Sequence, residues 1–99
     1  MYNCAYIHWV KVEFDSAKAA SNLKKHGVAF DAASAALLDP LALVIEDPDA
    51  IGEQRWLLVG ISDFGLLTVC YTLRGDETIR MISARKATTK EKKYYAQGI

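Results

Sequence analysis

Hydrophobic and polar positions alternate near the start of the chain, as they do in a strand with one buried face. Val10, Val12 and Phe14 fall on one side of residues 7–14, and charged residues fall on the other. Asp15 follows where a helix N-cap belongs, because its carboxylate can accept the free N–H groups of a first helical turn. We therefore expect the chain to pass directly from this strand into a helix.

That helix is predicted over residues 16–26, with Ala19 and Leu23 one turn apart on its apolar side. Gly27 stands just beyond its end, where a positive φ is common and has no steric cost for glycine. A second, shorter helix is predicted over residues 31–38 and is ended by the aspartate and proline that follow. Two helices therefore separate the first strand from the rest of the chain.

The remaining sequence has the short apolar runs and turn residues of an antiparallel sheet. Gly75-Asp76 is typical of a hairpin turn, and the connections are short, so the last three strands are expected to form a meander. The strands are predicted at residues 41–45, 55–62, 66–73 and 78–85, with Leu57, Val59 and Ile61 facing inward.

Thr88 and Glu91 have the spacing of a capping box, which predicts a C-terminal helix. The expected order is β-α-α-β-β-β-β-α, with no repeat and no linker. This order indicates an α+β fold in which helices pack against an antiparallel sheet. Residues 1–99 are interpreted as a single domain, since a chain of 99 residues can bury a modest core without help.

Twelve basic residues balance twelve acidic ones, so the total charge does not indicate a polyanionic partner. The two signs are separated along the chain, however. Residues 39–53 contain acidic residues and no lysine or arginine, whereas residues 80–93 contain Glu91 against six basic residues: Arg80, Arg85, Lys86, Lys90, Lys92 and Lys93. A neutral protein with this distribution can still attract an anion locally.

The cysteines and the N-terminus indicate the compartment. Cys4 and Cys70 are far apart and belong to no CxxC motif, which favours two buried, reduced thiols in a reducing compartment. No basic residue precedes Lys11, unlike in a signal peptide, and no uncharged run approaches the roughly twenty residues of a membrane span. We expect a cytoplasmic protein without a membrane segment.

Two arginines of the basic segment suit a phosphate, because a guanidinium can hold phosphate oxygens with two parallel hydrogen bonds. Arg80 and Arg85 are five positions apart, so in a regular strand they face opposite sides. A bulge near Ser83-Ala84, or the end of the strand there, would bring them to the same side. Without it they are separate surface arginines beside a solvated, lysine-rich helix, and the spacing alone favours neither interpretation.

Two further groups pair a proton-transfer candidate with a cation. Lys25 and His26 close the first helix; imidazole suits proton transfer near neutral pH, but cations in a last turn also simply favour the carbonyl end of a helix. Glu53 and Arg55 lie two apart at a strand start, either as a base beside a phosphate ligand or as a local ion pair. His8, in the first strand, is interpreted as structural or exposed.

The sequence has no metal-ligand spacing, no GxSxG and no phosphate-binding glycine loop. A reaction would therefore use basic side chains, a histidine and a few carboxylates or tyrosines, with no metal and no cofactor. Cleavage of RNA fits that inventory, because RNA supplies its own nucleophile. The 2′-OH attacks the adjacent phosphate when a base takes its proton, cations stabilise the phosphorane, and an acid protonates the departing 5′-oxygen.

Several stretches of the sequence resemble BrnT-type toxins. They are FDSAKAASNLKKHGVAF at residues 14–30, DPLALV at 39–44, EQR at 53–55 and IRMISARKA at 79–87, continued by Glu91 and Tyr95. The resemblance covers residues 12–96. The combination of N-x-x-K-H-G with R-x-I-S-A-R at this distance is specific, although either motif alone would be weak.

The resemblance implies a RelE-like fold and a ribonuclease that halts translation by cutting RNA. It also implies a ribbon–helix–helix antitoxin of the BrnA type, which sequesters the toxin and lets the pair repress its own operon. Operator DNA would then be contacted only through the antitoxin. Two alternatives remain: a non-catalytic partner that binds the antitoxin and tunes repression, and a domain that binds some other anion.

The resemblance also implies roles for individual residues. The catalytic candidates are His26, Glu53, Arg55, Arg80 and Arg85; the RNA-binding candidates are Lys25, Lys86, Lys90 and Lys93; and Tyr95 is a further candidate. Three positions depart from the family: Phe14 stands where tryptophan is usual, and Lys92 and Lys93 stand where arginine is usual. Lysine keeps the charge but cannot contact a phosphate through a planar fork.

Overall fold

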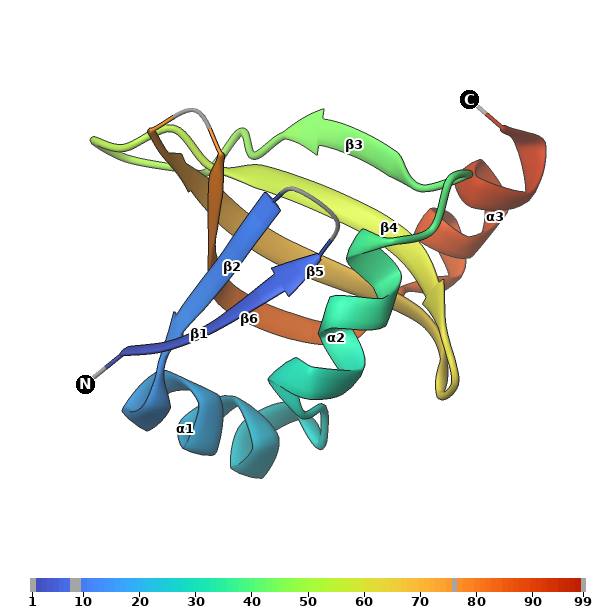
Figure 1. Cartoon of the computed structure of the whole chain (residues 1–99). Coiled ribbons are helices and arrows are strands. Elements are labelled where there is room, and N and C mark those ends of the chain that lie inside the picture. The colour runs from blue at the N-terminus through green and yellow to red at the C-terminus, as the bar shows by residue number, and fades with distance from the viewer. Residues whose placement is uncertain (1, 8–9, 76, 99) are drawn as a thin grey trace.

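The structure, a computed structural model, describes residues 2–7, 10–75 and 77–98, of which residues 2–7 and 10 are described by their backbone alone. Within these residues, six strands form one mixed sheet and three helices lie against it (Figure 1). In chain order the elements are β1 (Tyr2–Ile7), β2 (Val10–Asp15), α1 (Ser16–His26), α2 (Phe30–Leu37), β3 (Leu43–Glu46), β4 (Trp56–Ser62), β5 (Gly65–Arg74), β6 (Thr78–Lys86) and α3 (Thr89–Gln97).

The sheet differs from the predicted one in two ways. Its strand order is β1-β2-β6-β5-β4-β3, and the additional strand β1 forms an antiparallel hairpin with β2. The predicted order therefore lacked one strand, since the single strand predicted at residues 7–14 takes in the end of β1 and most of β2. The prediction of an antiparallel sheet is also wrong at one place: β2 pairs with β6 in parallel, because α1, α2 and three strands lie between them in the chain.

Helices α1 and α2 cover one face of the sheet and bury the main core there (Figure 1). Phe30 of α2 is 2% exposed and meets the ring of Phe14 edge-on, with the ring centroids 5.3 Å apart. Gly60 of β4 lets α2 approach closely, because a Cβ there would lie 2.4 Å from the carbonyl oxygen of Ala36. Any larger residue at this position would push α2 off the sheet.

Strand β4 corrects the prediction that Leu57, Val59 and Ile61 face inward. Leu58 belongs to the core under α2, while Ile61 is 47% exposed. Leu57 is half-buried and Val59 is buried on the opposite face of the sheet, outside that core. The alternation misled because both faces of β4 carry apolar residues, so the pattern did not show which side meets the helices.

A bulge in β6 puts Arg80 and Arg85 on the same face of the sheet. Cys70 of β5 pairs with Ser83, but the next residue of β5, Tyr71, pairs with Met81, so Ile82 is an extra residue in β6. On either side of the bulge, Arg80 pairs with Thr72 and Arg85 pairs with Thr68. Because Thr68 and Thr72 are four apart on β5, they share a face, and the two arginines therefore share it too. The expected bulge is confirmed, one residue before Ser83.

Asn22 joins α1 to the part of β6 that lies beyond its pairing with β2, which ends at Arg80. Its Nδ2 donates to the carbonyl oxygen of Ala84 at 2.8 Å, and its Oδ1 accepts the N–H of Ala84 at 3.0 Å. Nδ2 also donates to the carbonyl oxygen of Val28 at 2.9 Å, just after the helix. The amide thus takes the place of a strand partner for Ala84 and holds the chain that follows α1.

The ends of α1 are as predicted, but its buried side is not. Asp15 accepts the N–H of Ala17 at 2.8 Å, and Gly27 has a φ of 70°. Leu23, which was placed on the apolar stripe, is 52% exposed, whereas Asn22 is 5% exposed. An asparagine is therefore the deeply buried residue of this helix, because the sheet edge needs hydrogen bonds there rather than an apolar surface.

We expect Asn22→Ala to lower the free energy of unfolding by roughly 2–4 kcal/mol, because it leaves buried backbone groups of Ala84 and Val28 without partners. Urea denaturation of purified protein measures this change. Ser21→Ala, at the exposed neighbouring position of the same helix, is the matched control and should change stability little. Equal stability of the two variants would contradict the role assigned to Asn22.

Candidate functional site

The face of the sheet opposite α1 and α2 carries the arginines, and we call it the arginine face. Strand pairing places on it three side chains each from β6 and β5 and two from β4. These are Arg80, Ser83, Arg85, Thr68, Cys70, Thr72, Leu57 and Val59. The loop before β4 adds Arg55. The bulge is what makes the β6 contribution possible, since a regular strand would turn Arg80 or Arg85 toward the core.

One end of the arginine face is a line of polar residues that crosses the strands. Thr72 pairs with Arg80 on one side, and Arg80 in turn pairs with Glu13 of β2. On the other side of Thr72, the Trp56–Tyr71 pair brings Arg55 alongside, and Arg55 accepts the N–H of Asp47 at 2.8 Å. The backbones of Arg55 and Arg80 are thus two strands, or about 10 Å, apart, which is within reach of one nucleotide for two long side chains.

Cys70 lies at the centre of the arginine face and is 8% exposed. Its Sγ is 4.0 Å from Oδ2 of Asp47, and Arg55, Ser83 and Arg85 are close enough to affect its titration. Burial, together with the charge of Asp47, raises the pKa of the Cys70 thiol. The thiol therefore stays protonated at neutral pH, so Cys70 is a small, neutral side chain at the base of the site and not a nucleophile.

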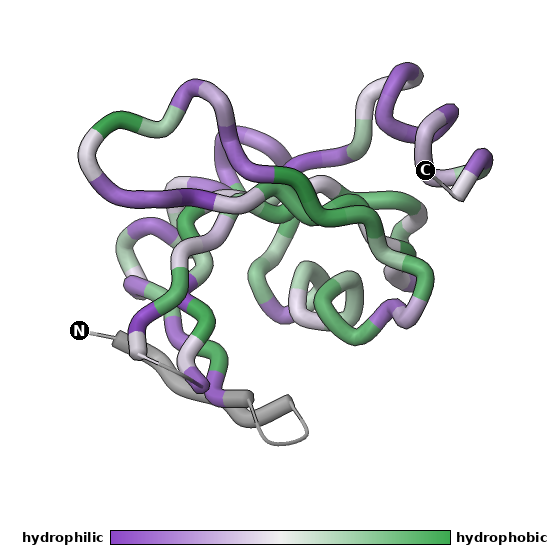
Figure 2. Tube along the Cα trace, turned by 90° about the horizontal axis from the view of Figure 1, so that it is seen from above, coloured by the Kyte–Doolittle hydropathy of each residue, from purple (hydrophilic) through white to green (hydrophobic). Residues whose placement is uncertain are grey.

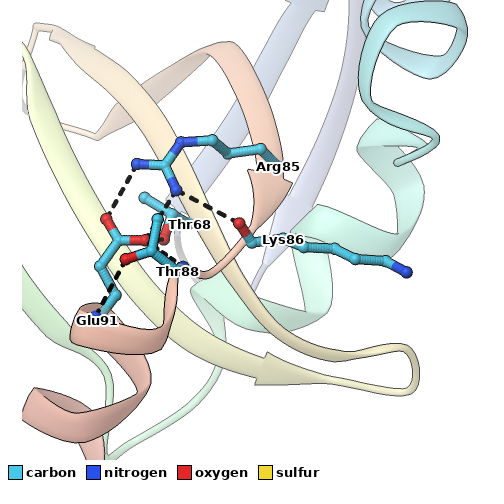
Figure 3. A network of polar contacts seen from close by, with 5 residues as sticks. All are labelled: Thr68, Arg85, Lys86, Thr88 and Glu91. Atoms are coloured by element: carbon cyan, nitrogen blue, oxygen red, sulfur yellow. Dashed lines mark hydrogen bonds and ion pairs between the residues drawn. The ribbon is translucent and has the colours of Figure 1, made fainter.

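Glu91 of α3 binds the guanidinium of Arg85 through two parallel hydrogen bonds (Figure 3). Its Nη1 and Nη2 donate to the two carboxylate oxygens of Glu91 at 2.7 and 2.9 Å. Glu91 also accepts from the hydroxyl of Thr68 at 2.9 Å and from the N–H of Thr88 at 2.8 Å. The hydrogen bonds from Arg85, with those from Thr88 and Thr68, outweigh burial and lower the pKa of Glu91 to about 2.

Arg80 and Arg85 therefore share a face, and on it Arg85 is paired with Glu91. Glu91 holds Nη1 and Nη2 of Arg85, so in this structure Arg85 anchors α3 to the sheet and has fewer N–H groups left for a phosphate. A second contact completes the anchor: the hydroxyl of Tyr95 donates to Oδ2 of Asp39 at 2.5 Å, and this hydrogen bond raises the pKa of Tyr95. Because the described part of α3 buries no residue, these polar contacts are its principal attachment.

Lys25 and His26 come to the edge of the arginine face. A shallow hollow of about 210 Å³ lies between α1 and the bulge of β6. It is lined by Lys18, Ser21, Asn22, Lys25, His26, Ile82 and Ser83. Since Ser83 also belongs to the arginine face, the hollow that Lys25 and His26 line reaches the edge of that face at the bulge.

Glu53 and Arg55 form the predicted local ion pair, with Glu53 Oε1 3.6 Å from Arg55 Nε. That distance is too long for a hydrogen bond, and Arg55 Nε is buried without a hydrogen-bond partner. The two side chains are 52% and 37% exposed, respectively, so both are partly in contact with solvent although Nε itself is covered. Arg55 is consequently held less tightly by its carboxylate than Arg85 is by Glu91, and it remains available to an anion.

The remaining candidates are spread over other surfaces. Lys86 lines a different hollow, together with Leu23 and Phe64, and points away from the Arg85–Glu91 pair (Figure 3). Lys90 and Lys93 are exposed on α3, where the Nζ of Lys90 is 5.8 Å from the ring centroid of Tyr94. Tyr95 contacts the loop before β3 rather than the arginines. The lysines and Tyr95 are thus not part of one compact site.

Sequence reasoning did not assign roles to Asn22, Ser83 or Asp47. Asn22 and Ser83 belong to the two motifs, which could have marked them, whereas Asp47 was noticed only as one of many acidic residues. The predictions for His8 and Cys4 fall on residues whose side chains lie outside the described part of the chain. Among the described residues, no group of three or more histidine, cysteine or carboxylate side chains is arranged to hold a metal ion.

The family model for the ribonuclease toxin BrnT of type II toxin–antitoxin systems matches residues 14–91. The chain belongs to the BrnT family. A crystal structure of the Brucella abortus ribonuclease toxin BrnT has the same fold, with a TM-score of 0.59 and 24% sequence identity over 77% of this chain and 94% of that one. No curated protein sequence matches the chain.

The matched residues include both motifs, the bulge and the Arg85–Glu91 pair, and they exclude β1 and Tyr95. As a member of this family, the chain is a ribonuclease toxin of a type II system, whose partners are an antitoxin and an RNA target. Within the described residues, none of the three helices has the length and apolar composition needed to cross a membrane.

The Arg85–Glu91 pair predicts a specific dependence of stability on pH. Because the folded protein lowers the pKa of Glu91, the stabilisation is complete above the ordinary value of 4.5 and is lost as the pH falls toward about 2. We expect Glu91→Gln to be less stable than wild type at pH 7, with a difference that shrinks below pH 4.5 and disappears near pH 2.

Urea denaturation at a series of pH values measures this difference. Glu77→Gln, at an exposed carboxylate before β6, is the control and should follow the wild-type curve. A constant difference between wild type and Glu91→Gln across the whole range would show that the charge of Glu91 is not what holds Arg85.

Proposed function

We propose that this BrnT-family chain is a metal-independent RNA endonuclease with a RelE-like fold, and that its arginine face is the active surface. The observation that carries the proposal is the bulge at Ile82. It places Arg80, Ser83 and Arg85 on one face, beside Arg55, and it brings the end of α1 with His26 to the same edge. Cations and a proton-transfer group near one another are what cleavage by the 2′-OH of RNA uses, which supports the proposal.

Arg55 and Arg80 are the proposed ligands of the scissile phosphate. They flank Thr72, and each presents a guanidinium that can donate to phosphate oxygens through two hydrogen bonds. Their positive charge is most useful in the transition state, where the phosphorane carries more negative charge than the bound phosphate. Glu91 already occupies two N–H groups of Arg85, so we assign its first role to holding α3.

Two proton transfers accompany the reaction. The 2′-oxygen forms a bond to phosphorus while a base takes its proton, and the bond from phosphorus to the 5′-oxygen breaks as an acid supplies a proton to that oxygen. His26 and Glu53 are the proposed proton-transfer groups, on opposite sides of the two arginines. Asp47 is an additional carboxylate between Arg55 and Cys70, and it is held in place by its backbone hydrogen bond to Arg55.

The lysines are proposed to attract RNA rather than to act on it. Lys25 lies beside His26 at the edge of the site, whereas Lys90 and Lys93 extend the positive field over α3. Contacts of this kind follow the phosphate backbone and weaken with salt. Lys86, on the side of the helices, is the least suited of the four to meet the same RNA segment.

The antitoxin is proposed to be a ribbon–helix–helix protein of the BrnA type that joins the toxin to operator DNA. The alternative function, a non-catalytic co-repressor, keeps the antitoxin and dispenses with cleavage. The two are distinguished by expressing the chain without its antitoxin in bacteria. A ribonuclease toxin arrests growth, whereas a co-repressor leaves growth unchanged and still alters the affinity of the antitoxin for its operator in a gel shift.

The proposed mechanism uses no metal, so cleavage should survive chelation. We expect purified protein to cut RNA at the same rate in buffer and in an excess of EDTA over total divalent ions. RNA in which every 2′-OH is replaced by 2′-methoxy should bind and remain intact. Activity that disappears with EDTA and returns on adding Mg²⁺ would overturn the mechanism.

Loss of either proposed phosphate ligand should abolish toxicity without unfolding the protein. We expect Arg55→Ala and Arg80→Ala each to lower the cleavage rate by about 100-fold or more, the usual effect of removing one donor to a transition-state anion. Arg74→Ala, at the exposed end of β5, is the matched control and should remain toxic. If Arg55→Ala and Arg80→Ala both arrest growth like wild type, the arginine face is not the active surface.

A further inference from the structure

The acidic segment of the chain is also its most exposed apolar one, and the proposed function uses only its last residues. Four large apolar side chains of residues 39–53 are exposed: Leu41 by 72%, Val44 by 47%, Ile45 by 60% and Ile51 by 93%. The acidic residues of this segment lie among them: Asp39, Glu46, Asp47, Asp49 and Glu53. Apolar side chains exposed together in this way mark an interaction surface more often than chance exposure does.

Two of these four apolar residues, Val44 and Ile45, line a groove. It has a volume of about 460 Å³ and lies between β3 and α3, over the apolar part of β4. Its lining consists of Ala42, Leu43, Val44, Ile45, Leu57, Val59, Glu91 and Tyr94. All but Glu91 present mainly apolar atoms, so the groove suits apolar side chains of a partner rather than a charged small molecule.

Strand β3 adds a backbone edge to this groove. It is the last strand of the sheet and pairs only with β4 within the described residues, so the other side of its backbone is unpaired. The sequence of β3, Leu-Val-Ile-Glu, contains no lysine or proline, and its three apolar residues leave Glu46 as the only charge in this short edge strand. Figure 2, which looks down on β3, shows its hydrophobic trace leading into the hydrophilic loop that follows.

The charges around the groove indicate the chemistry of its occupant. Glu46 and Asp47 continue directly from the apolar residues of β3, and Asp49 follows in the loop. A surface of this sign repels RNA and attracts a basic segment. Exposed apolar side chains next to carboxylates thus fit a peptide segment that carries apolar residues together with lysine or arginine.

We propose that the groove and the outer edge of β3 are the docking surface for the antitoxin, which binds through an extended segment of mixed apolar and basic residues. The identity of the occupant rests on the proposed function, because a DNA-binding antitoxin carries lysine and arginine in excess. The apolar side chains of the segment fill the groove against Leu57 and Tyr94, and its basic side chains meet Glu46 and Asp49. Its backbone extends the sheet beyond β3.

This position also accounts for neutralisation. The backbone of β3 continues into Asp47, which is bonded to Arg55 at the end of the arginine face. A segment that follows the outer edge of β3 in this direction lies across Asp47 from Arg55, about 10 Å away by strand spacing, and obstructs the approach of RNA from that side. The antitoxin then excludes the substrate by covering one end of the site, and it need not contact His26 or Arg80.

The test separates toxicity from neutralisation. Ile45→Lys puts a positive charge at the centre of the surface, on a side chain that is 60% exposed and outside the proposed catalytic set. We expect this variant to arrest growth like wild type, to bind the antitoxin cloned from the same operon at least 10-fold more weakly, and to escape neutralisation when both are co-expressed. Ile51→Lys, in the loop, should weaken binding in the same direction and cannot disturb the sheet.

The control is Phe64→Lys, at a side chain that is 73% exposed in the turn between β4 and β5 and that lines the hollow beside α1 and α2 rather than the groove. It should be neutralised like wild type. Full neutralisation of both Ile45→Lys and Ile51→Lys would overturn the proposal. So would gel filtration showing that wild type alone is a dimer and Ile45→Lys a monomer, since the occupant would then be a second copy of this chain.

The two proposals fail in different ways. If wild type is not toxic by itself but binds the antitoxin, and Ile45→Lys does not, the ribonuclease mechanism is wrong and the docking surface is supported. If wild type is toxic and Ile45→Lys binds the antitoxin with unchanged affinity, the docking surface is wrong and the active surface is unaffected. Isothermal titration calorimetry with the purified antitoxin measures these affinities directly.

Discussion

The pairing of the Asn22 amide with the backbone of Ala84 is the interaction on which the rest of the structure depends. Asn22 belongs to the motif that ends α1, and Ala84 belongs to the motif that ends β6, so two stretches distant in the sequence are joined by the hydrogen bonds of one side chain. A buried amide that lacked these partners would be costly, which fixes the distance between helix and strand closely. His26 owes its place beside Ser83 to this attachment.

The bulge at Ile82 lets β6 serve both the core and the site. Met81 and Ala84 are buried under α1 and α2, while Arg80, Ser83 and Arg85 face the opposite way. The two arginines of β6 therefore have different neighbours on this face. Arg85 is tied to Glu91 and holds a helix that buries almost nothing of its own, whereas Arg80 shares its row with Thr72 and Arg55.

The local features of the chain could be predicted because they depend on neighbouring residues. The cap at Asp15, the positive φ at Gly27 and the capping box of Thr88 with Glu91 follow from side chains a few positions apart. The sequence could also show that a bulge is needed for Arg80 and Arg85 to act together. Residues five apart in a regular strand face opposite sides, and they share a face only if the strand gains or loses a residue.

Features that depend on distant partners could not be predicted in the same way. The parallel pairing of β2 with β6 joins residues more than sixty positions apart, and no short pattern encodes it. The pairing of Arg85 with Glu91 could not be predicted without knowing where α3 packs against the sheet. Asp47 gains its place beside Cys70 only through the register of β3 against β4, so in the sequence it is one acidic residue among several.

The measurement that tests the account most directly is a crystal structure of this chain with a short RNA whose 2′-OH is replaced by 2′-methoxy at the cleavage site. The account predicts a phosphate bound between the guanidinium groups of Arg55 and Arg80, above Cys70, with the 2′-oxygen directed toward a proton-transfer group at the margin of the arginine face. A phosphate bound instead to the exposed lysines of α3, with Arg55 and Arg80 free of RNA, would contradict it.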